Sequence, residues 1–402
     1  MKVLFITILL PYPIDSGAKY KTHHILKLIS AKNNIDFVSM IDDEHDLVNA
    51  EPLKKYCRTY KVFFSPIVNA RHNQLLFKLA LSVFLTKPFI VFKYYSHEMK
   101  NYIEELCRNR KYDLIYIDHL NMAQYIPVGY VGKLIYDEAD ISSLAFTSFS
   151  IYENNPLLKF IYILESSKLK RFERKYLKKF HHIFTISELD RKRIIKVGNL
   201  HEKKITHLPV PFKTLNLYSY RERDPLISFI GLLSWKPNLK GIIWFIDKVY
   251  PHIKRSIPSV RMKIAGKMGN RLMKHLNNIA DMSISYEGYL VNLDSLYKKT
   301  SVFINPIHEG GGVRIKLLHA LSRGMPVVST SKGAEGVPVT SSKEVVIADD
   351  PLSFAEAVIE IIKNKETGRH LSEQGLALME KHYNHDLTDK ILKSVIYRGS
   401  DK

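Results

Sequence analysis

The sequence predicts an α/β fold made of two domains with doubly wound parallel sheets, and three observations support this prediction. The chain has 402 residues, which is too long for one ordinary domain but fits two of about 200. Short apolar segments typical of strands alternate with helical segments in both halves, as in parallel sheets whose strands are joined by helices. Residues 208–224 hold two prolines and no clear periodicity, so we interpret them as a linker.

The N-terminal half therefore spans residues 1–207 and begins with an apolar strand, residues 2–10. Further strands are expected at residues 35–40, 61–64, 112–117, 133–136 and 182–187, and helices at 18–30, 74–95 and 157–180. Ligands of open α/β sheets bind at the carboxyl ends of strands. The loop at residues 11–17 follows the first strand, so Gly17 faces the expected ligand site, although a turn before a helix explains this glycine almost as well.

The C-terminal half spans residues 225–386 and repeats the alternation. Strands are expected at residues 226–230, 260–265, 284–287, 302–305 and 326–329. Helices are expected from Gly241 onward and over residues 313–322.

A glycine-rich turn opens the helix at residues 313–322. Gly310, Gly311 and Gly312 bring backbone N–H groups close to a ligand, and a helix N-terminus attracts anions. Arg314 and Lys316 oppose the helix dipole there, so their presence indicates a bound anion, most simply a diphosphate. The alternative is an ordinary strand–helix turn with packing glycines and two solvated cations.

Residues 306–337 resemble the donor-binding segment of the retaining GT-B glycosyltransferases known as group 1 or family 4. The shared pattern includes a glycine pair, two cations, a helix and a Pro-Val-Val strand. The matching residues are Gly311, Gly312, Arg314, Lys316, Ala320, Gly324, Pro326, Val327, Val328, Thr330, Gly333, Glu335 and Gly336.

The resemblance implies a GT-B fold, in which two Rossmann-like domains face a central cleft, with the last helix, residues 387–402, packing back onto the first domain. It implies transfer of a hexosyl group, with retention, from a UDP- or GDP-sugar to a glycan or lipid-linked acceptor, as in bacterial cell-surface polysaccharide synthesis. The residues expected to act in catalysis are His119, Arg314 and Lys316. Those expected to bind the donor are Gly17, Gly231, Lys240, Tyr289, Glu309, Gly310, Gly311, Gly312, Val313 and His319.

Two acidic positions of the family pattern are missing in this sequence. His319 stands where the family has a glutamate that binds the donor ribose, and Glu309 is the nearest acidic residue that could replace a second missing carboxylate. The sequence therefore leaves a second hypothesis open, a donor-binding but catalytically inactive partner subunit of a glycosyltransferase.

Composition bears on cofactors and partners. Two cysteines make no disulfide framework, which fits a reducing cytoplasm. The acidic pairs have the wrong spacing for a metal site, so we expect no metal or other cofactor.

The formal charge of +20 attracts polyanions. The basic stretch at residues 168–204 is either a solvated helix face or a contact with the inner face of the plasma membrane, and nucleic acid is not expected because no recognition motif accompanies the charge.

The apolar segment at residues 74–95 also leaves two interpretations open. A core helix is the default, and a helix that touches lipid at the mouth of the cleft is the alternative. The sequence has no apolar stretch of the roughly 20 residues that a membrane span needs.

Overall fold

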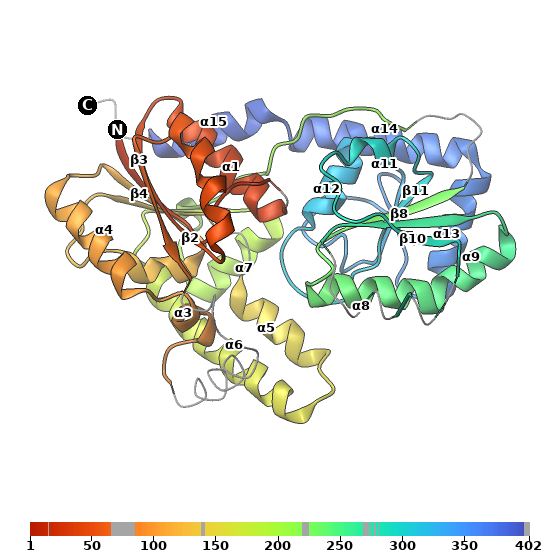
Figure 1. The fold of residues 1–402 in the computed structure, drawn as a ribbon, viewed down its shortest axis with the longest axis horizontal. Helices are drawn as coiled ribbons and strands as arrows, with labels where there is room; N and C mark the ends of the chain where they lie inside the picture. The colour runs from red at the N-terminus through yellow and green to blue at the C-terminus, as the bar shows by residue number, and fades with distance from the viewer. Residues whose placement is uncertain are drawn as a thin grey trace. The chain divides into compact units, whose positions relative to one another are not determined.

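The computed structural model describes residues 1–14, 16–65, 85–137, 141–218, 225–267, 272, 275–276, 279 and 281–397. The chain divides into two compact units (Figure 1). The first, the N-terminal unit, holds Met1–Leu208, Gly310–Gly312 and Val395–Lys402. The second, the C-terminal unit, holds Pro209–Glu309 and Val313–Ser394.

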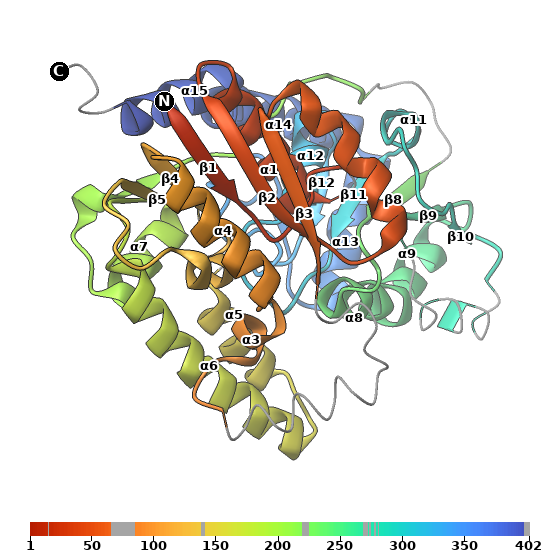
Figure 2. The ribbon, with the colours of Figure 1, turned by 60° about the vertical axis from the view of Figure 1, so that its left-hand side comes forward.

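The N-terminal unit is built on a parallel sheet of seven described strands in the order β3-β2-β1-β4-β5-β6-β7. Its strands are β1 (Lys2–Ile6), β2 (Asn34–Ile41), β3 (Thr59–Phe64), β4 (Leu114–Asp118), β5 (Lys133–Asp137), β6 (His182–Thr185) and β7 (Ile205–His207). The helices between them are α1 (Gly17–Ser30), α3 (Phe89–Lys93), α4 (His97–Asn109), α5 (Ser142–Ile151), α6 (Pro156–Leu177) and α7 (Glu188–Gly198). Figure 2 shows β1, β2 and β3 side by side with α1 and α4 on opposite sides of them.

The C-terminal unit is built on a second parallel sheet, of six described strands in the order β10-β9-β8-β11-β12-β13. Its strands are β8 (Leu226–Ile230), β9 (Arg261–Ala265), β10 (Ile284–Tyr286), β11 (Val302–Asn305), β12 (Val327–Ser329) and β13 (Val346–Ile347). The helices are α8 (Lys236–Trp244), α9 (Tyr250–Ser256), α11 (Asp294–Tyr297), α12 (Ile315–Ser322), α13 (Pro351–Lys363), α14 (Lys365–His382) and α15 (His385–Ile396).

Each sheet has its own hydrophobic core, as expected for helices packed on both faces of a parallel sheet. Leu4, Ile117 and Ile183 belong to the core of the N-terminal unit and are fully buried. Phe229 and Ile304 belong to the core of the C-terminal unit and are also fully buried. Two separate cores and two all-parallel sheets confirm the prediction of two doubly wound α/β domains.

Some boundaries differ from the sequence prediction. The helix expected from Gly241 begins at Lys236, because Pro237 occupies its first turn, where a proline is well tolerated. Gly241 instead lies inside the helix, where a β-carbon would come within 2.1 Å of the Pro306 carbonyl oxygen. The first strand ends at Ile6 rather than at residue 10. Half of the helix expected over residues 74–95 falls outside the described residues, and in the described half the prediction is wrong, because only α3, Phe89–Lys93, is helical and Pro88 precedes it.

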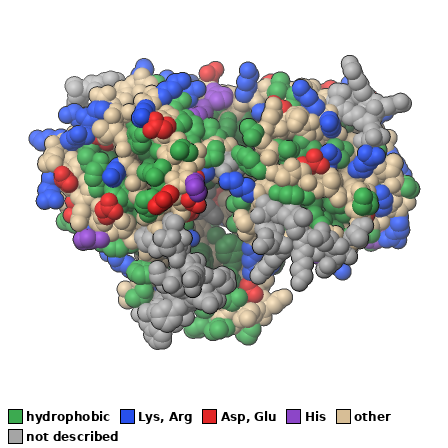
Figure 3. Space-filling model, in the orientation of Figure 1, with side chains coloured by type: hydrophobic (Ala, Val, Ile, Leu, Met, Phe, Trp, Pro, Cys, Tyr) green, Lys and Arg blue, Asp and Glu red, His purple; other side chains and the backbone are tan. Residues whose placement is uncertain are grey.

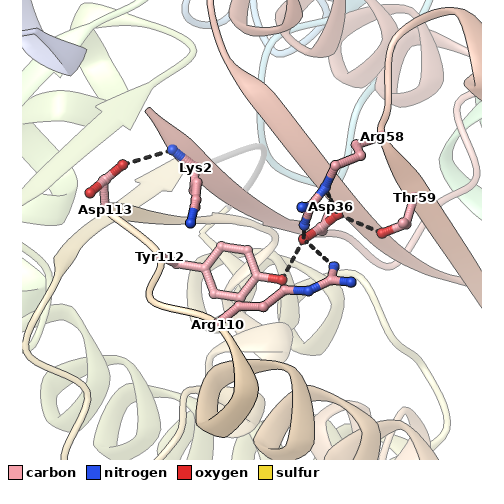
Figure 4. A network of polar contacts seen from close by, with 7 residues as sticks. All are labelled: Lys2, Asp36, Arg58, Thr59, Arg110, Tyr112 and Asp113. Carbon is pink, nitrogen blue, oxygen red and sulfur yellow. Dashed lines mark hydrogen bonds and ion pairs between the residues drawn. The ribbon is translucent and has the colours of Figure 1, made fainter.

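A buried carboxylate ties the strands of the N-terminal unit together near their amino ends. Asp36 on β2 is 1% exposed and accepts hydrogen bonds from Arg58, Thr59, Arg110 and Tyr112, with the Arg110 Nη1 to Asp36 Oδ2 distance at 3.0 Å (Figure 4). Burial alone would raise the pKa of Asp36, but these hydrogen bonds outweigh it and lower the pKa. The donors come from two segments, residues 58–59 at the start of β3 and residues 110–112 before β4, so this cluster fixes how β2, β3 and the start of β4 lie together.

Candidate functional site

The glycine predicted at the end of β8 lies where two side chains approach the backbone. A β-carbon on Gly231 would lie 2.9 Å from Asn238 Nδ2 and 3.2 Å from Lys316 Nζ. Asn238 comes from α8 and Lys316 from the first turn of α12. The fold of the C-terminal unit therefore brings Gly231 and Lys316, 85 positions apart in the sequence, to one point at the carboxyl edge of its sheet.

Lys316 is held by a polar and an aromatic contact. Its Nζ donates a hydrogen bond to Asn238 Oδ1 and lies 4.5 Å from the centroid of the Phe229 ring. Burial lowers the pKa of Lys316 well below its usual 10.5, and the nearby Arg314 lowers it further. A bound anion would reverse this shift, because an opposite charge favours the protonated amine.

Arg314 precedes α12 and is 4% exposed. Its Nη2 donates to the Glu309 carbonyl oxygen at 3.1 Å, and its guanidinium carbon lies 5.3 Å from the centroid of the Trp235 ring. This packing holds the guanidinium in one place beside Lys316. Fixed cations at a helix N-terminus are suited to a diphosphate group.

Lys240 and Glu309, both predicted to bind the donor, form an ion pair. The Lys240 Nζ to Glu309 Oε2 distance is 2.9 Å, and Glu309 is 3% exposed. The pair joins α8 to the segment after β11. In this structure Lys240 therefore has a carboxylate partner next to the glycine-rich turn.

The glycine-rich turn has the backbone conformation that its composition predicts. Gly310 has φ +95° and Gly312 has φ +70°, backbone conformations that residues other than glycine rarely adopt. Gly310–Gly312 group with the N-terminal unit, and Val313, 8% exposed, groups with the C-terminal unit.

His319 is an uncharged ring at neutral pH. Its Nδ1 lies 3.0 Å from the Tyr297 hydroxyl oxygen, and its ring centroid is 6.0 Å from that of Phe212. Burial, followed by the charge of Arg323, lowers the pKa of His319 to about 4. His319 thus supplies no charge to this site, unlike the glutamate of the family pattern.

The remaining donor-binding predictions lie on separate elements. Tyr289 follows β10, is 44% exposed, and its ring centroid lies 5.8 Å from Lys267 Nζ. Gly17 is the first residue of α1, in the N-terminal unit, where the side chain of Ser16 caps the helix by accepting from the Lys19 N–H.

His119 directly follows β4, at the carboxyl edge of the N-terminal sheet. Its backbone has φ +71°, an unusual value for a residue other than glycine. Its Nδ1 lies 3.2 Å from Asp118 Oδ1. Burial alone would lower the pKa of His119, but the Asp118 carboxylate outweighs this effect and the pKa is raised.

Sequence reasoning missed several side chains at the carboxyl edges of the two sheets. In the C-terminal unit these are Phe229, Trp235 and Asn238; in the N-terminal unit they are Thr7, Lys21 and Thr22 around Asp118 and Asp137. The proline at position 237 was a usable signal for an earlier start of α8, which would have placed Asn238 in the first turn of that helix. No local pattern indicated Lys21 or Thr22.

Two further findings concern metals and membranes. Within the described ranges, no group of three or more His, Cys, Asp or Glu side chains is arranged to hold a metal ion. None of the helices in that part of the chain is both long and apolar enough to cross a membrane.

Known proteins share the motif and the fold. Residues 224–364 match the family described as glycosyl transferases group 1. An uncharacterized 44.6 kDa protein in the cps region of Klebsiella pneumoniae is 23% identical over 416 residues, which cover 98% of each chain.

Two solved structures resemble the whole chain. Sucrose-phosphate synthase from Thermosynechococcus elongatus has a TM-score of 0.72 at 12% identity, with 99% of this chain and 98% of that chain covered. HepE from Anabaena, in complex with UDP and glucose, has a TM-score of 0.69 at 13% identity, with 98% of this chain and 99% of that chain covered. The likeness confirms the GT-B fold, and together with the matched domain it supports a GT-B glycosyltransferase.

Proposed function

We propose that this chain is a retaining glycosyltransferase that moves a hexosyl group from a UDP-sugar to a glycan or lipid-linked acceptor. One observation carries the proposal: Arg314 and Lys316 both lie at the start of α12, near enough for the charge of Arg314 to lower the pKa of Lys316, within the domain that matches group 1 glycosyltransferases. UDP is favoured over GDP because the similar HepE structure holds UDP and glucose.

The chemistry explains why these cations matter. In glycosyl transfer the bond between the anomeric carbon and the diphosphate oxygen breaks, and an acceptor hydroxyl forms the new bond and loses its proton. Negative charge grows on the leaving diphosphate. Cations that are already fixed in place stabilise that charge without reorganisation. Arg314 is fixed by the Glu309 carbonyl and Trp235, and Lys316 by Asn238 and Phe229.

A bound diphosphate would offset the burial and the Arg314 charge that lower the pKa of Lys316. An anion beside a buried lysine favours its protonated form. A diphosphate would therefore strengthen the charge of Lys316, and the Arg314 guanidinium stays charged in any case. This arrangement requires no metal ion.

A second function rests on His319. Because this ring is neutral and lies 3.0 Å from the Tyr297 hydroxyl, it does not reproduce the carboxylate that the family places on the donor ribose. The chain would then bind a nucleotide sugar without transferring it, as a partner subunit of another glycosyltransferase.

The proposed location is the cytoplasmic face of the membrane. The exposed charged side chains of α6 are all Lys or Arg, since Glu165 and Glu173 are buried. The N-terminal half of the same helix exposes Leu157, Phe160 and Ile163. Apolar side chains beside cations favour an anionic lipid surface. Elsewhere, Lys and Arg are spread over the face shown in Figure 3. We further propose that the pathway is that of a cell-surface polysaccharide.

The proposal is tested by turnover of UDP-glucose and a panel of other UDP-sugars, measured as UDP release. Lys316→Met keeps the length of the side chain but removes its charge, and we expect turnover to fall about a hundredfold, the usual loss when one preorganised charge is removed. Lys343→Met, an exposed lysine of the same unit, should leave turnover unchanged. Equal turnover in wild type and Lys316→Met would refute the assignment, whereas donor binding without turnover in wild type would favour the partner subunit.

A further inference from the structure

Two carboxylates lie next to each other inside the N-terminal unit. Asp118 ends β4 and Asp137 ends β5, and the two residues are direct neighbours in the parallel register. Asp118 is 1% exposed and Asp137 is 2% exposed. Two buried negative charges on adjacent strands repel each other strongly, so both stay ionised only if cations balance them.

Lys21 and His119 are the cations that face this pair. Lys21 Nζ, on α1, lies 2.7 Å from Asp137 Oδ1, and the Tyr116 hydroxyl donates to Asp137 Oδ2 at 2.8 Å. His119 Nδ1 lies 3.2 Å from Asp118 Oδ1. Two carboxylates, one ammonium and one imidazolium sum to zero net charge, so the balance of the cluster favours a protonated His119.

Asp118 is fixed by its second oxygen. Asp118 Oδ2 accepts hydrogen bonds from Thr7 Oγ1 at 2.9 Å and from Thr22 Oγ1 at 2.6 Å. These two donors come from the end of β1 and from α1. They hold the carboxylate so that Oδ1 points toward the imidazole ring.

His119 is the accessible member of the cluster. Its side chain is 24% exposed, compared with 4% for Lys21. Its backbone is held at φ +71°, a conformation that costs free energy for any side chain and recurs at functional sites. Because Nδ1 faces Asp118, the other ring nitrogen, Nε2, is left to meet a ligand.

We propose that Asp118 is a positioning residue, which with the Lys21–Asp137 pair holds His119 protonated and oriented so that Nε2–H donates a hydrogen bond to an oxygen of a sugar substrate. The role rests on the proposed function, since it needs a sugar substrate at the carboxyl edge of the N-terminal sheet. The groups that act on the ring are Asp118 from β4, Lys21 from α1 and Asp137 from β5. The two carboxylates favour its proton, and Lys21 opposes it.

The first test is a titration of His119 by NMR, which requires no activity. The imidazole signal is assigned by its loss in His119→Gln. Asp118→Asn preserves shape but removes the charge, and we expect the pKa of His119 to fall by about one unit or more. Asp113→Asn is the matched control, because Asp113 lies at the opposite end of β4 and accepts from the Lys2 backbone N–H.

The second test is kinetic. In Asp118→Asn we expect kcat for the UDP-sugar to fall about tenfold or more, and the limb of the pH–rate profile where activity falls as pH rises to move to lower pH. If Asp118→Asn does not fold, Thr22→Val removes one support of the carboxylate and should shift that limb in the same direction by a smaller amount.

The outcomes distinguish the inference from the proposed function. An unchanged His119 titration, or a fall in kcat with no shift of the pH–rate profile, would leave Asp118 a structural residue and overturn the inference. A wild-type protein that turns over no UDP-sugar but shows the raised titration, lost in Asp118→Asn, would instead refute the proposed function while confirming the Asp118–His119 coupling.

Discussion

The backbone of Gly266 passes so close to Gly231 that a β-carbon on Gly266 would lie 1.9 Å from the Gly231 carbonyl oxygen. Gly266 also has φ +133°, and its N–H donates to the Gly288 carbonyl at 2.9 Å, while the Gly231 N–H donates to Ala265 at 3.0 Å. The carboxyl ends of β8, β9 and β10 thus meet through three glycines. This close approach brings the ends of the strands together beside Lys316.

The first prediction concerns Gly266→Ala. The added methyl group would collide with backbone, which cannot move away cheaply, so we expect a loss of about 3 kcal/mol or more of unfolding free energy. Urea denaturation measures it. Gly288→Ala is the control: Gly288 has φ +75° with open space around it, so only the cost of the left-handed backbone, about 1 kcal/mol, is expected. Equal losses in the two variants would contradict the collision.

The second prediction concerns the pH dependence that Asp36 confers. Its pKa is lowered in the folded protein, so its ion pairs stabilise the fold above the unfolded pKa of about 3.9, and this contribution is lost as pH falls through the folded pKa. Asp36→Asn should therefore cost about 3 kcal/mol at pH 7 and less at pH 3.5. The control is Asp113→Asn. Asp113, which is also labelled in Figure 4, accepts one hydrogen bond from the Lys2 backbone N–H, so this variant should lose under about 1 kcal/mol of unfolding free energy. A deficit in Asp36→Asn that stays constant with pH would exclude the ionic explanation.

The third prediction concerns His319. Its folded pKa of about 4 lies below the usual 6.5, so the unfolded chain binds its proton first and stability falls as pH drops from 6.5 toward 4. Between pH 7 and pH 5, the protonation of His319 in the unfolded chain should lower the free energy of unfolding by about 2 kcal/mol. His319→Gln should remove this pH dependence, and the exposed His370→Gln should retain it. Identical pH profiles for wild type and His319→Gln would mean that the ring is charged or solvated.

The fourth prediction concerns α6. Vesicles that contain phosphatidylglycerol should bind the wild-type protein, and vesicles of phosphatidylcholine alone should bind it much less. Each exposed Lys or Arg near such a surface contributes about 1 kcal/mol, so Lys170→Glu with Arg171→Glu should weaken binding by at least about tenfold. Lys343→Glu and Lys365→Glu place the same charge change on the C-terminal unit and should have little effect. Binding is measured by co-sedimentation with the vesicles. If both double variants co-sediment to the same extent, α6 is not the part of the protein that contacts the lipid surface.

The sequence predicted correctly those strands and site residues that a short local pattern marks. β8 runs from Leu226 to Ile230 and β11 from Val302 to Asn305, as their apolar runs predicted, because a buried parallel strand is apolar on both faces. Arg314 and Lys316 were found because a glycine-rich turn at a helix start marks an anion site, and Gly231 was found through the resemblance to the family.

The rest depended on contacts that no local pattern encodes. Thr22 and Asp118 are 96 positions apart, and they meet because β1 pairs with β4, which is set by the order of strands across the sheet. Asn238 was placed in a loop because the start of α8 was predicted at Gly241. The neutral state of His319 follows from burial and from Arg323, which only the tertiary structure reveals.

The measurement that tests the central claim most directly is thermal unfolding of the protein with UDP, GDP and their sugars, in wild type, Lys316→Met and Lys343→Met. A ligand at a hundred times its Kd should add about 2.7 kcal/mol of stability, which raises Tm by about 3 °C for a chain of this length. We predict such a rise with UDP and a UDP-sugar, retained in Lys343→Met and lost in Lys316→Met. No rise with any nucleotide, or an equal rise in all three proteins, would contradict a diphosphate site at the start of α12.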